Sequence, residues 1–193
     1  NNRRLGLVPK AATGGAEDLG KSANSAWRGE RRQDRAGWLR VLMDFAPMGW
    51  AIGAAVGIAR AKPGCPVVCL TGDGSYLMNG QEMATAAQYG AKVLFVVINN
   101  GMYGTIRMHQ EREYPDHVTG SKLQNPDFAA LAAAYGYVGL RIERTQEFES
   151  ALLEALARPQ GTLLEVMLDP EVITTRGTLS AITQAALKQQ NAS

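Results

Sequence analysis

Strand-length apolar segments alternate with segments of helical pattern, and this alternation constrains the fold of the 193-residue chain more than any other feature. The apolar segments are 67–71, 93–98, 138–142 and 162–168. The segments predicted to be helices are 49–61, 80–89, 127–135, 145–157 and, in the tail, 179–189. Continuous apolar strands that alternate with helices are typical of a parallel sheet covered on both faces. We therefore predict an α/β fold of three layers, α/β/α, with a mainly parallel sheet.

The first predicted helix carries a glycine at every fourth residue, at Gly49, Gly53 and Gly57. Residues four apart lie on one face of a helix. Because a glycine inside a helix costs up to ~1 kcal/mol, three of them on one face indicate a surface that packs very closely against its neighbour.

Residues 1–40 differ in composition from the rest of the chain. They are rich in Gly, Ser, Asn, Arg and Ala, show no hydrophobic period and carry a net charge of +5, whereas the remainder carries −3. We read 1–40 as an irregular lead-in or linker of unassigned role, and 41–193 as the domain, with a C-terminal tail from about residue 170. A nucleic-acid-binding domain would carry the positive charge itself, so nucleic acid is not an expected partner.

The apolar segments are far shorter than the roughly 20 residues that a membrane span needs, and we expect no membrane association. No signal-peptide pattern is present, and a chain that opens on Asn1 resembles a processed or excised piece of a cytoplasmic protein. Cys65 and Cys69 would lie about 13 Å apart on an extended strand, too far for a disulfide. We expect two free thiols.

Polar, glycine-rich turns follow the first two apolar strands: Gly72-Asp73-Gly74-Ser75 and Asn99-Asn100-Gly101. Ligands of parallel sheets bind at the carboxyl ends of the strands. Asp73 and the amide of Asn100 offer the oxygen ligands that Mg²⁺ prefers, and glycines let backbone amides approach a phosphate. One carboxylate is an incomplete shell, so oxygens of a diphosphate ligand and water would complete it. Either turn alone is more often a plain turn, and no Gly-x-Gly-x-x-Gly dinucleotide pattern follows a strand.

The spacing of the two turns resembles a known family motif. Gly72-Asp73-Gly74, 24 intervening residues and Asn99-Asn100 resemble the cofactor motif in the diphosphate-binding domain of thiamine diphosphate-dependent enzymes. The longer strings 72–82 and 99–107 resemble the acetolactate synthase-like branch, and benzoylformate decarboxylase is similar nearby. The resemblance runs from about residue 45 to 180 and implies the thiamine diphosphate-binding fold.

The resemblance implies a role for each residue that matches the motif. The implied Mg²⁺ ligands are Asp73, the side-chain oxygen of Asn100 and the backbone carbonyl of Met102. The implied contacts to the diphosphate come from Gly72, Gly74 and Ser75, and from the backbone of Tyr103 and Gly104. Met48 would support the bent cofactor, and the carbonyl of Ala46 would accept its aminopyrimidine amine. Many family members have Gly-Ser or Gly-Thr where this chain has Ala46-Pro47.

The family's activating glutamate lies on a different, pyrimidine-binding domain, and nothing in this chain resembles that domain. We therefore assign no catalytic residue here; Glu82 is expected to cap or pack in a helix. The implied partner is a pyrimidine-binding domain of the same chain or of a partner chain, in a homodimer or homotetramer that acts on a small 2-oxoacid. The isolated domain would be inactive.

The function that the resemblance implies is decarboxylation of a 2-oxoacid and ligation of the product to a second carbonyl compound, an acetolactate synthase-like transferase or lyase activity. A decarboxylase similar to benzoylformate or sulfopyruvate decarboxylase is the first alternative. His109 stands where true acetolactate synthases carry a tryptophan that shapes the substrate pocket, which keeps this alternative open. A non-catalytic subunit that retains the fold is the second alternative.

Overall fold

The structure is a computed structural model that describes residues 32–33, 39–40, 47–174 and 177–191. It divides into two compact units, residues 1–47 and residues 48–193. In the first unit, strands β1 (Arg32–Gln33) and β2 (Leu39–Arg40) form an antiparallel pair. The rest of the predicted lead-in and Ala46 lie outside the described residues, and the domain boundary at residue 40 stays a prediction.

The second unit is built on a parallel sheet with the strand order β3-β4-β6-β5. The strands are β3 (Val68–Gly72), β4 (Leu94–Asn99), β6 (Thr162–Met167) and β5 (Val138–Ile142). Each corresponds to one of the predicted apolar segments. The central strands β4 and β6 have side chains buried on both faces, which explains their continuous apolar sequence.

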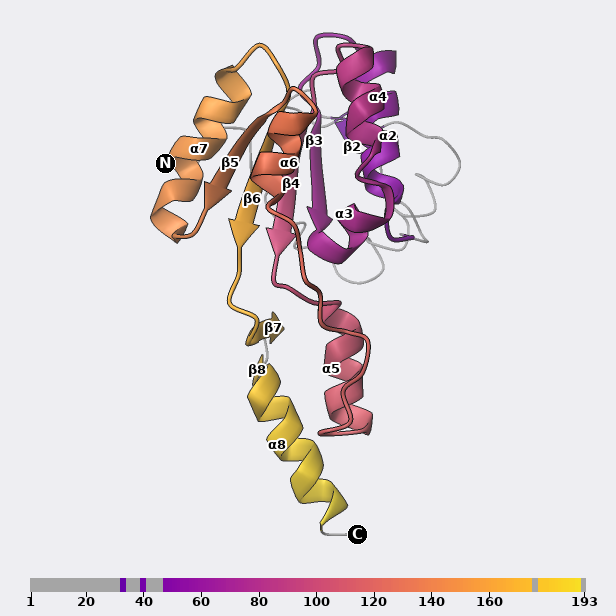
Figure 1. The fold of residues 1–193 in the computed structure, drawn as a ribbon, viewed down its shortest axis with the longest axis vertical. Coiled ribbons are helices and arrows are strands. Elements are labelled where there is room, and N and C mark those ends of the chain that lie inside the picture. Colours follow the sequence, from indigo (N-terminus) through magenta and orange to yellow (C-terminus); the bar gives the residue numbers. More distant parts are fainter. Residues whose placement is uncertain (1–31, 34–38, 41–46, 175–176, 192–193) are drawn as a thin grey trace. The chain divides into compact units, whose positions relative to one another are not determined.

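Helices cover both faces of this sheet, which confirms the predicted three-layer fold (Figure 1). One face carries α2 (Trp50–Ala61), α3 (Asp73–Asn79), α4 (Glu82–Gln88) and α6 (Phe128–Ala134). The other carries α7 (Thr145–Ala157), which packs on β5 and β6. Helix α7 does not extend over β3. Val68 and Leu70, on the face of β3 that α7 leaves uncovered, are therefore 41% and 66% exposed.

Aromatic side chains fill the larger of the two cores. Tyr76 meets Phe128 edge to face with ring centroids 5.1 Å apart, and Phe95 lies 5.8 Å from Tyr137. The Tyr137 hydroxyl donates a hydrogen bond to the carbonyl of Ala91 at 2.7 Å. These contacts join α3, α6 and β4 and hold the helical layer against the strands whose ends form the polar turns.

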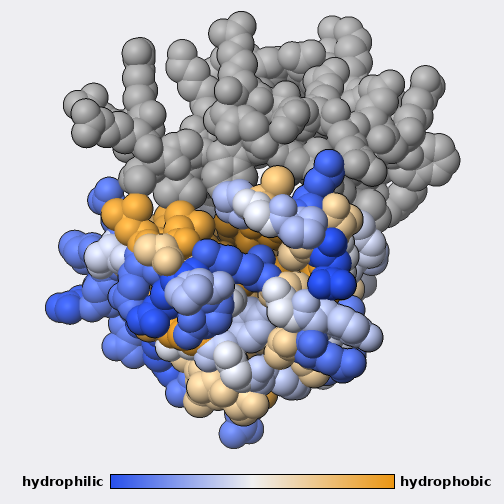
Figure 2. Space-filling model, turned by 90° about the horizontal axis from the view of Figure 1, so that it is seen from above, coloured by the Kyte–Doolittle hydropathy of each residue, from blue (hydrophilic) through white to orange (hydrophobic). Residues whose placement is uncertain are grey.

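A further group of elements lies beyond the carboxyl ends of the strands (Figure 1). It consists of α5 (Gly104–Glu113), the antiparallel pair β7 (Val172–Thr174) and β8 (Gly177–Thr178), and α8 (Leu179–Gln190). Helix α8 packs against α5. At the opposite end of the sheet the described surface is mostly hydrophilic, with apolar residues in several separate areas (Figure 2).

Helix α3, helix α5 and the β7–β8 pair are not predicted by the sequence pattern. Helix α3 begins at Asp73, inside the segment predicted to be a turn. Helix α5 has an almost wholly polar sequence with Glu111 as its buried residue, so it lacks the apolar stripe by which a helix is recognised. The predicted tail helix is confirmed as α8.

The prediction of a close-packed glycine face holds at only one end of α2. Gly49 has φ +85°, and a Cβ there would lie 3.1 Å from the Cβ of Met78. The nearest atom to a Cβ at Gly53 is the Asn79 side chain, at an ordinary 3.6 Å. At Gly57 the close packing is not seen within the described part of the chain, where a Cβ would meet nothing within 4 Å. Within the described residues, no helix is long and apolar enough to cross a membrane.

A Gly139→Ala substitution will destabilise the fold. Its Cβ would lie 2.0 Å from the backbone carbonyl oxygen of Ala129 on α6, so the helix and strand must separate. We expect the free energy of unfolding to fall by about 2–4 kcal/mol. Gly57→Ala is the matched control and should be stabilising by about 0.5–1 kcal/mol. Urea titrations followed by circular dichroism measure both; equal free energies for wild type and Gly139→Ala would contradict the packing described here.

The two cysteines will differ in reactivity. Both are free thiols, as predicted; Cys65 is exposed and Cys69 is buried. Burial raises the pKa of Cys69 to about 12, so at pH 8 about one molecule in 10,000 carries the thiolate that reacts. We expect iodoacetamide at pH 8 to label one site, which the Cys65→Ser variant abolishes, and a second only in urea. Equal labelling of both thiols in the folded chain would show that Cys69 is accessible.

Candidate functional site

The register of β3 and β4 brings the two polar turns together. Gly72, the last residue of β3, pairs with Ile98, so Asp73 and Asn99 follow at the same edge of the sheet. The backbone N–H of Gly101 donates a hydrogen bond to Oδ2 of Asp73 at 2.8 Å. Residues 28 apart in sequence are thus in direct contact at the carboxyl end of the sheet.

Asp73 is 3% exposed, and its two carboxylate oxygens have different partners. Oδ2 accepts two hydrogen bonds, from Gly101 N at 2.8 Å and from Asn125 Nδ2 at 2.7 Å. Oδ1 accepts one, from the N–H of Gly74 at 2.9 Å. A carboxylate oxygen has two lone-pair sites. Oδ1 therefore keeps a site for a cation, whereas Oδ2 is fully used.

Asn100 and Met102 lie in the loop between β4 and α5. Oδ1 of Asn100 accepts the N–H of Met102 at 3.2 Å, which leaves that oxygen a second lone pair. Met102 pairs with Lys122 in an antiparallel bridge whose hydrogen bonds are made by the flanking residues. In such a pair the N–H and C=O of the central residue point away from the partner strand. The carbonyl of Met102 is therefore directed away from Lys122, to the side on which its N–H meets Asn100.

The turn before α2 lies against the start of α3. The N–H of Gly49 donates a hydrogen bond to Oγ of Ser75 at 2.9 Å. Met48 precedes this glycine and is 43% exposed, and its role beneath the cofactor stays a prediction. Ala46, the predicted acceptor of the aminopyrimidine amine, lies outside the described residues.

Close approaches within the site require glycine at two positions. A Cβ on Gly74 would lie 2.5 Å from the ring of Tyr103, and a Cβ on Gly104 would lie 2.9 Å from Nδ2 of Asn100. At Gly72 a Cβ would meet nothing within 4 Å, so the backbone of that residue borders open space. The predicted diphosphate contacts thus surround Asp73, although their role stays a prediction.

Three polar residues to which the sequence-based prediction gave no role at the site lie next to Asp73 or connect to it through hydrogen bonds. Asn125 Nδ2 also donates to Oδ1 of Asn99 at 2.8 Å, and Asn99 Nδ2 donates to Oε1 of Glu165 at 2.8 Å. Glu165 is 1% exposed in the centre of β6. A carboxylate in an otherwise apolar strand is a signal that could have identified it from sequence. Asn125 precedes Asp127, the residue at which the predicted helix over 127–135 begins; Asp127 caps α6 by accepting the N–H of Ala130 at 2.8 Å.

Oδ1 of Asn125 is buried and has no hydrogen-bond partner among the residues that the structure describes. A buried acceptor without a donor costs about 1–3 kcal/mol. Such a group calls for a ligand or a bound water to satisfy it.

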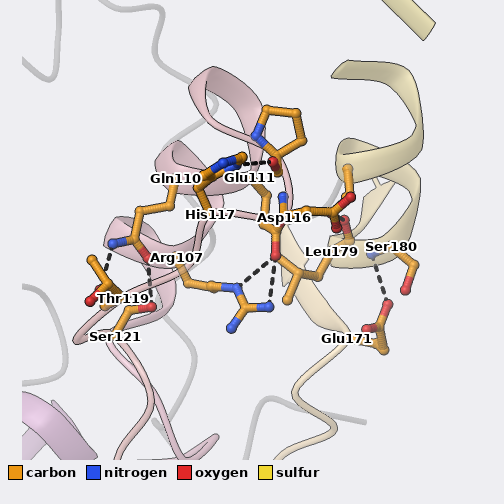
Figure 3. Close-up of polar contacts among 12 residues, drawn as sticks. Arg107, Gln110, Glu111, Asp116, His117, Thr119, Ser121, Glu171, Leu179 and Ser180 are labelled. Carbon is orange, nitrogen blue, oxygen red and sulfur yellow. Dashed lines mark hydrogen bonds and ion pairs between the residues drawn. The ribbon is translucent and has the colours of Figure 1, made fainter. Parts of the chain in front are cut away.

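Side chains on α5 anchor the loop that returns to the site (Figure 3). Arg107 pairs with the buried carboxylate of Glu111, with 2.7 Å between its terminal nitrogen and Oε1. Gln110 donates to the carbonyl of Thr119 at 2.7 Å and accepts the hydroxyl of Ser121 at 2.7 Å. Because residues 121–123 pair with residues 101–103, these contacts help to place Met102.

His109 is exposed on α5, and its predicted contribution to substrate choice stays untested. Glu82 is the first residue of α4, which agrees with the expectation that it belongs to a helix rather than to a catalytic pair.

The donor set fits a hard divalent cation. Among the described residues, no three His, Cys, Asp or Glu side chains gather around a common point. The predicted oxygen donors are one buried carboxylate, one amide and one backbone carbonyl, on Asp73, Asn100 and Met102. Mg²⁺ is usually held by one or two protein carboxylates together with phosphate oxygens and water.

Comparison with known proteins places this geometry in a family. Residues 18–166 match the family model described as thiamine pyrophosphate enzyme, C-terminal TPP binding domain. The acetolactate synthase isozyme 3 large subunit of Escherichia coli is 44% identical over 118 residues, which are 61% of this chain and 21% of that protein. A putative acetolactate synthase large subunit of Mycobacterium tuberculosis is 34% identical over 167 residues, 86% of this chain and 29% of that protein.

A solved structure shares the fold. Benzoylformate decarboxylase from Polynucleobacter necessarius superposes with a TM-score of 0.57 at 34% identity, covering 64% of this chain and 24% of that one. The chain therefore spans between a fifth and a third of the length of these relatives. The resemblance predicted from the two glycine turns is confirmed: this chain belongs to the thiamine pyrophosphate enzyme family, in which it corresponds to the C-terminal TPP-binding domain.

Proposed function

We propose that this chain forms the diphosphate- and Mg²⁺-binding half of the active site of an acetolactate synthase-like enzyme. The observation that carries the proposal is the buried carboxylate of Asp73, whose Oδ1 keeps an open lone-pair site at the edge of the sheet where the chain offers Asn100 and Met102. A domain that had lost cofactor binding would have no chemical need for this arrangement.

The residues of the chain divide the binding task among them. Asp73, the side-chain oxygen of Asn100 and the carbonyl of Met102 would hold Mg²⁺, which in turn would bind the diphosphate oxygens. Gly72, Gly74 and Ser75 would line the diphosphate, and the backbone of Tyr103 and Gly104 would cover it. Met48, which is 43% exposed, would support the organic part of the cofactor.

When bound, thiamine diphosphate supplies the electron sink for decarboxylation of a 2-oxoacid and for ligation of the remaining fragment to a second carbonyl compound. The chain contributes orientation and exclusion of water. The residue that activates the aminopyrimidine of the cofactor would be a glutamate of a pyrimidine-binding domain, in the same polypeptide or in a partner chain of a homodimer or homotetramer. Activity of the isolated domain is therefore not expected, and a cytoplasmic location stays a prediction.

A simple 2-oxoacid decarboxylase is the second candidate function. The superposition on benzoylformate decarboxylase and the exposed His109, in place of a pocket tryptophan, favour it. The greater weight lies with carboligation, because the relatives with 44% and 34% identity are acetolactate synthase large subunits. A non-catalytic subunit is the third candidate. The presence of Asp73 and Asn100 disfavours it, because a domain without cofactor binding would not need them.

Asp73→Ala will abolish cofactor binding by the 193-residue chain. Without the carboxylate, the remaining amide and carbonyl oxygens are neutral, and we expect affinity for thiamine diphosphate in the presence of Mg²⁺ to fall by about 100-fold or more. The measurement is quenching of tryptophan fluorescence, since the partly exposed Trp50 adjoins Met48 and Gly49. Glu149→Ala, which removes an exposed carboxylate of α7, is the matched control. Identical titrations for wild type and Asp73→Ala would refute the metal assignment.

Product analysis will separate carboligation from decarboxylation. We expect the chain, once joined to its pyrimidine-binding domain, to convert pyruvate into a ligated product such as acetolactate, detected by mass spectrometry. Free aldehyde as the sole product from pyruvate and from aromatic 2-oxoacids would favour the decarboxylase. Absence of turnover despite cofactor binding that depends on Asp73 would favour the non-catalytic subunit.

A further inference from the structure

We propose that Asn125 is a positioning residue for the Asp73 carboxylate, and that the buried Glu165 sets the orientation of Asn125 through Asn99. The inference rests on the proposed function, because it assigns to Asp73 the task of binding a divalent cation. It adds residues from β6 and from the loop before α6 that would not touch the metal.

The first step is the unequal use of the Asp73 oxygens. Asn125 Nδ2 and Gly101 N together saturate Oδ2, and only Gly74 N bonds to Oδ1. If the Asn125 donor were absent, each oxygen would accept one hydrogen bond and each would keep one open lone pair. Asn125 thus makes the two oxygens inequivalent and directs a cation to Oδ1.

The second step is the orientation of two amide groups. Asn125 faces two acceptors, Oδ2 of Asp73 and Oδ1 of Asn99, so it must present its NH₂ to both. Asn99 faces Glu165 and presents its own NH₂ to Oε1. Its Oδ1 is then directed to Asn125 and to the N–H of Gly101, which lies 3.2 Å away.

The third step is that these hydrogen bonds connect the two buried carboxylates through fixed amide orientations. Asn125 donates to Asp73 on one side and to Asn99 on the other, and Asn99 in turn donates to Glu165, so that both terminal carboxylates accept. Glu165 is itself held through Oε2, which accepts the N–H of Ala129 at 3.4 Å. Asp73, Asn99 and Glu165 are each 5% exposed or less, so bulk water has little access to replace a lost donor.

A fourth observation points to a ligand. Oδ1 of Asn125 takes no part in these hydrogen bonds. It is buried and has no hydrogen-bond partner among the described residues. Its amide cannot rotate to satisfy that oxygen without turning an acceptor toward Asp73. The amide is held in the orientation that serves the carboxylate although its own oxygen stays unpaired, as expected of a site organised around a bound group.

The test measures Mn²⁺ binding by electron paramagnetic resonance on the 193-residue chain with saturating thiamine diphosphate. We expect Asn125→Ala to weaken Mn²⁺ binding by roughly 10- to 100-fold, the range found when residues that support a metal ligand are replaced. Glu165→Gln should weaken binding in the same direction, because a glutamine offers an NH₂ to either Asn99 or Ala129 and breaks one bond. The double variant should lose little more than the greater single loss, since both act along one path.

Gln124→Ala, at the exposed neighbour of Asn125, is the matched control and should bind Mn²⁺ as wild type does. The spectrum of the bound ion is the second readout, and it should change for Asn125→Ala and Glu165→Gln but not for the control. A purely structural role would lower the thermal midpoint and leave the spectrum and the affinity of the folded protein unchanged. If Glu165→Gln does not fold, Asn125→Ala alone decides.

Two outcomes separate this inference from the proposed function. Wild-type affinity and spectrum in Asn125→Ala, together with loss of binding in Asp73→Ala, would overturn the positioning role and leave the metal site intact. Failure of wild type to bind Mn²⁺ with thiamine diphosphate would overturn both.

Discussion

The parallel pairing of β3 with β4 is the constraint on which the rest of the site depends. With Gly72 opposite Ile98, the residue after each strand emerges at the same edge, and Asp73 comes within hydrogen-bond distance of Gly101. A register shift of one residue would reverse which side chains of these strands face each core. The same register that buries Phe95 and Val97 therefore also places the carboxylate.

Burial of charge is the second physical condition of the site. Asp73 and Glu165 are nearly inaccessible to water, and the described residues that meet them are neutral donors, backbone N–H groups and amides. Neutral donors satisfy the carboxylate oxygens without neutralising their charge, so the attraction for a cation is retained. This differs from an ion pair such as Arg107–Glu111, in which the guanidinium compensates the carboxylate.

We propose that the chain forms one half of an active site; the relatives are between three and five times as long as the matched segment. We thus propose that this domain binds the diphosphate and the metal, whereas the residue that activates the cofactor lies on a different domain. Such a division explains why a well-formed arrangement of oxygens can occur without a nearby residue that we assign as catalytic. It also makes binding, rather than turnover, the property by which this chain is best examined.

The sequence alone determined the elements and the place of the site. Apolar continuity predicted the four strands, the flanking patterns predicted most helices, and the two glycine turns predicted that Asp73 and Asn100 belong to one site, because strand ends of a parallel sheet share an edge. It did not predict α5, whose polar sequence is stabilised by contacts with α8 and by the Arg107–Glu111 pair. It also gave no basis for joining Asn125 and Glu165 to Asp73. These residues are 52 and 92 positions away from Asp73. The β3-β4-β6 strand order brings Glu165 next to Asn99, and the loop before α6 brings Asn125 to Asp73. Local patterns in the amino-acid sequence indicate periodicity and turns. Hydrogen bonds between separate strands and loops form only once the sheet has assembled.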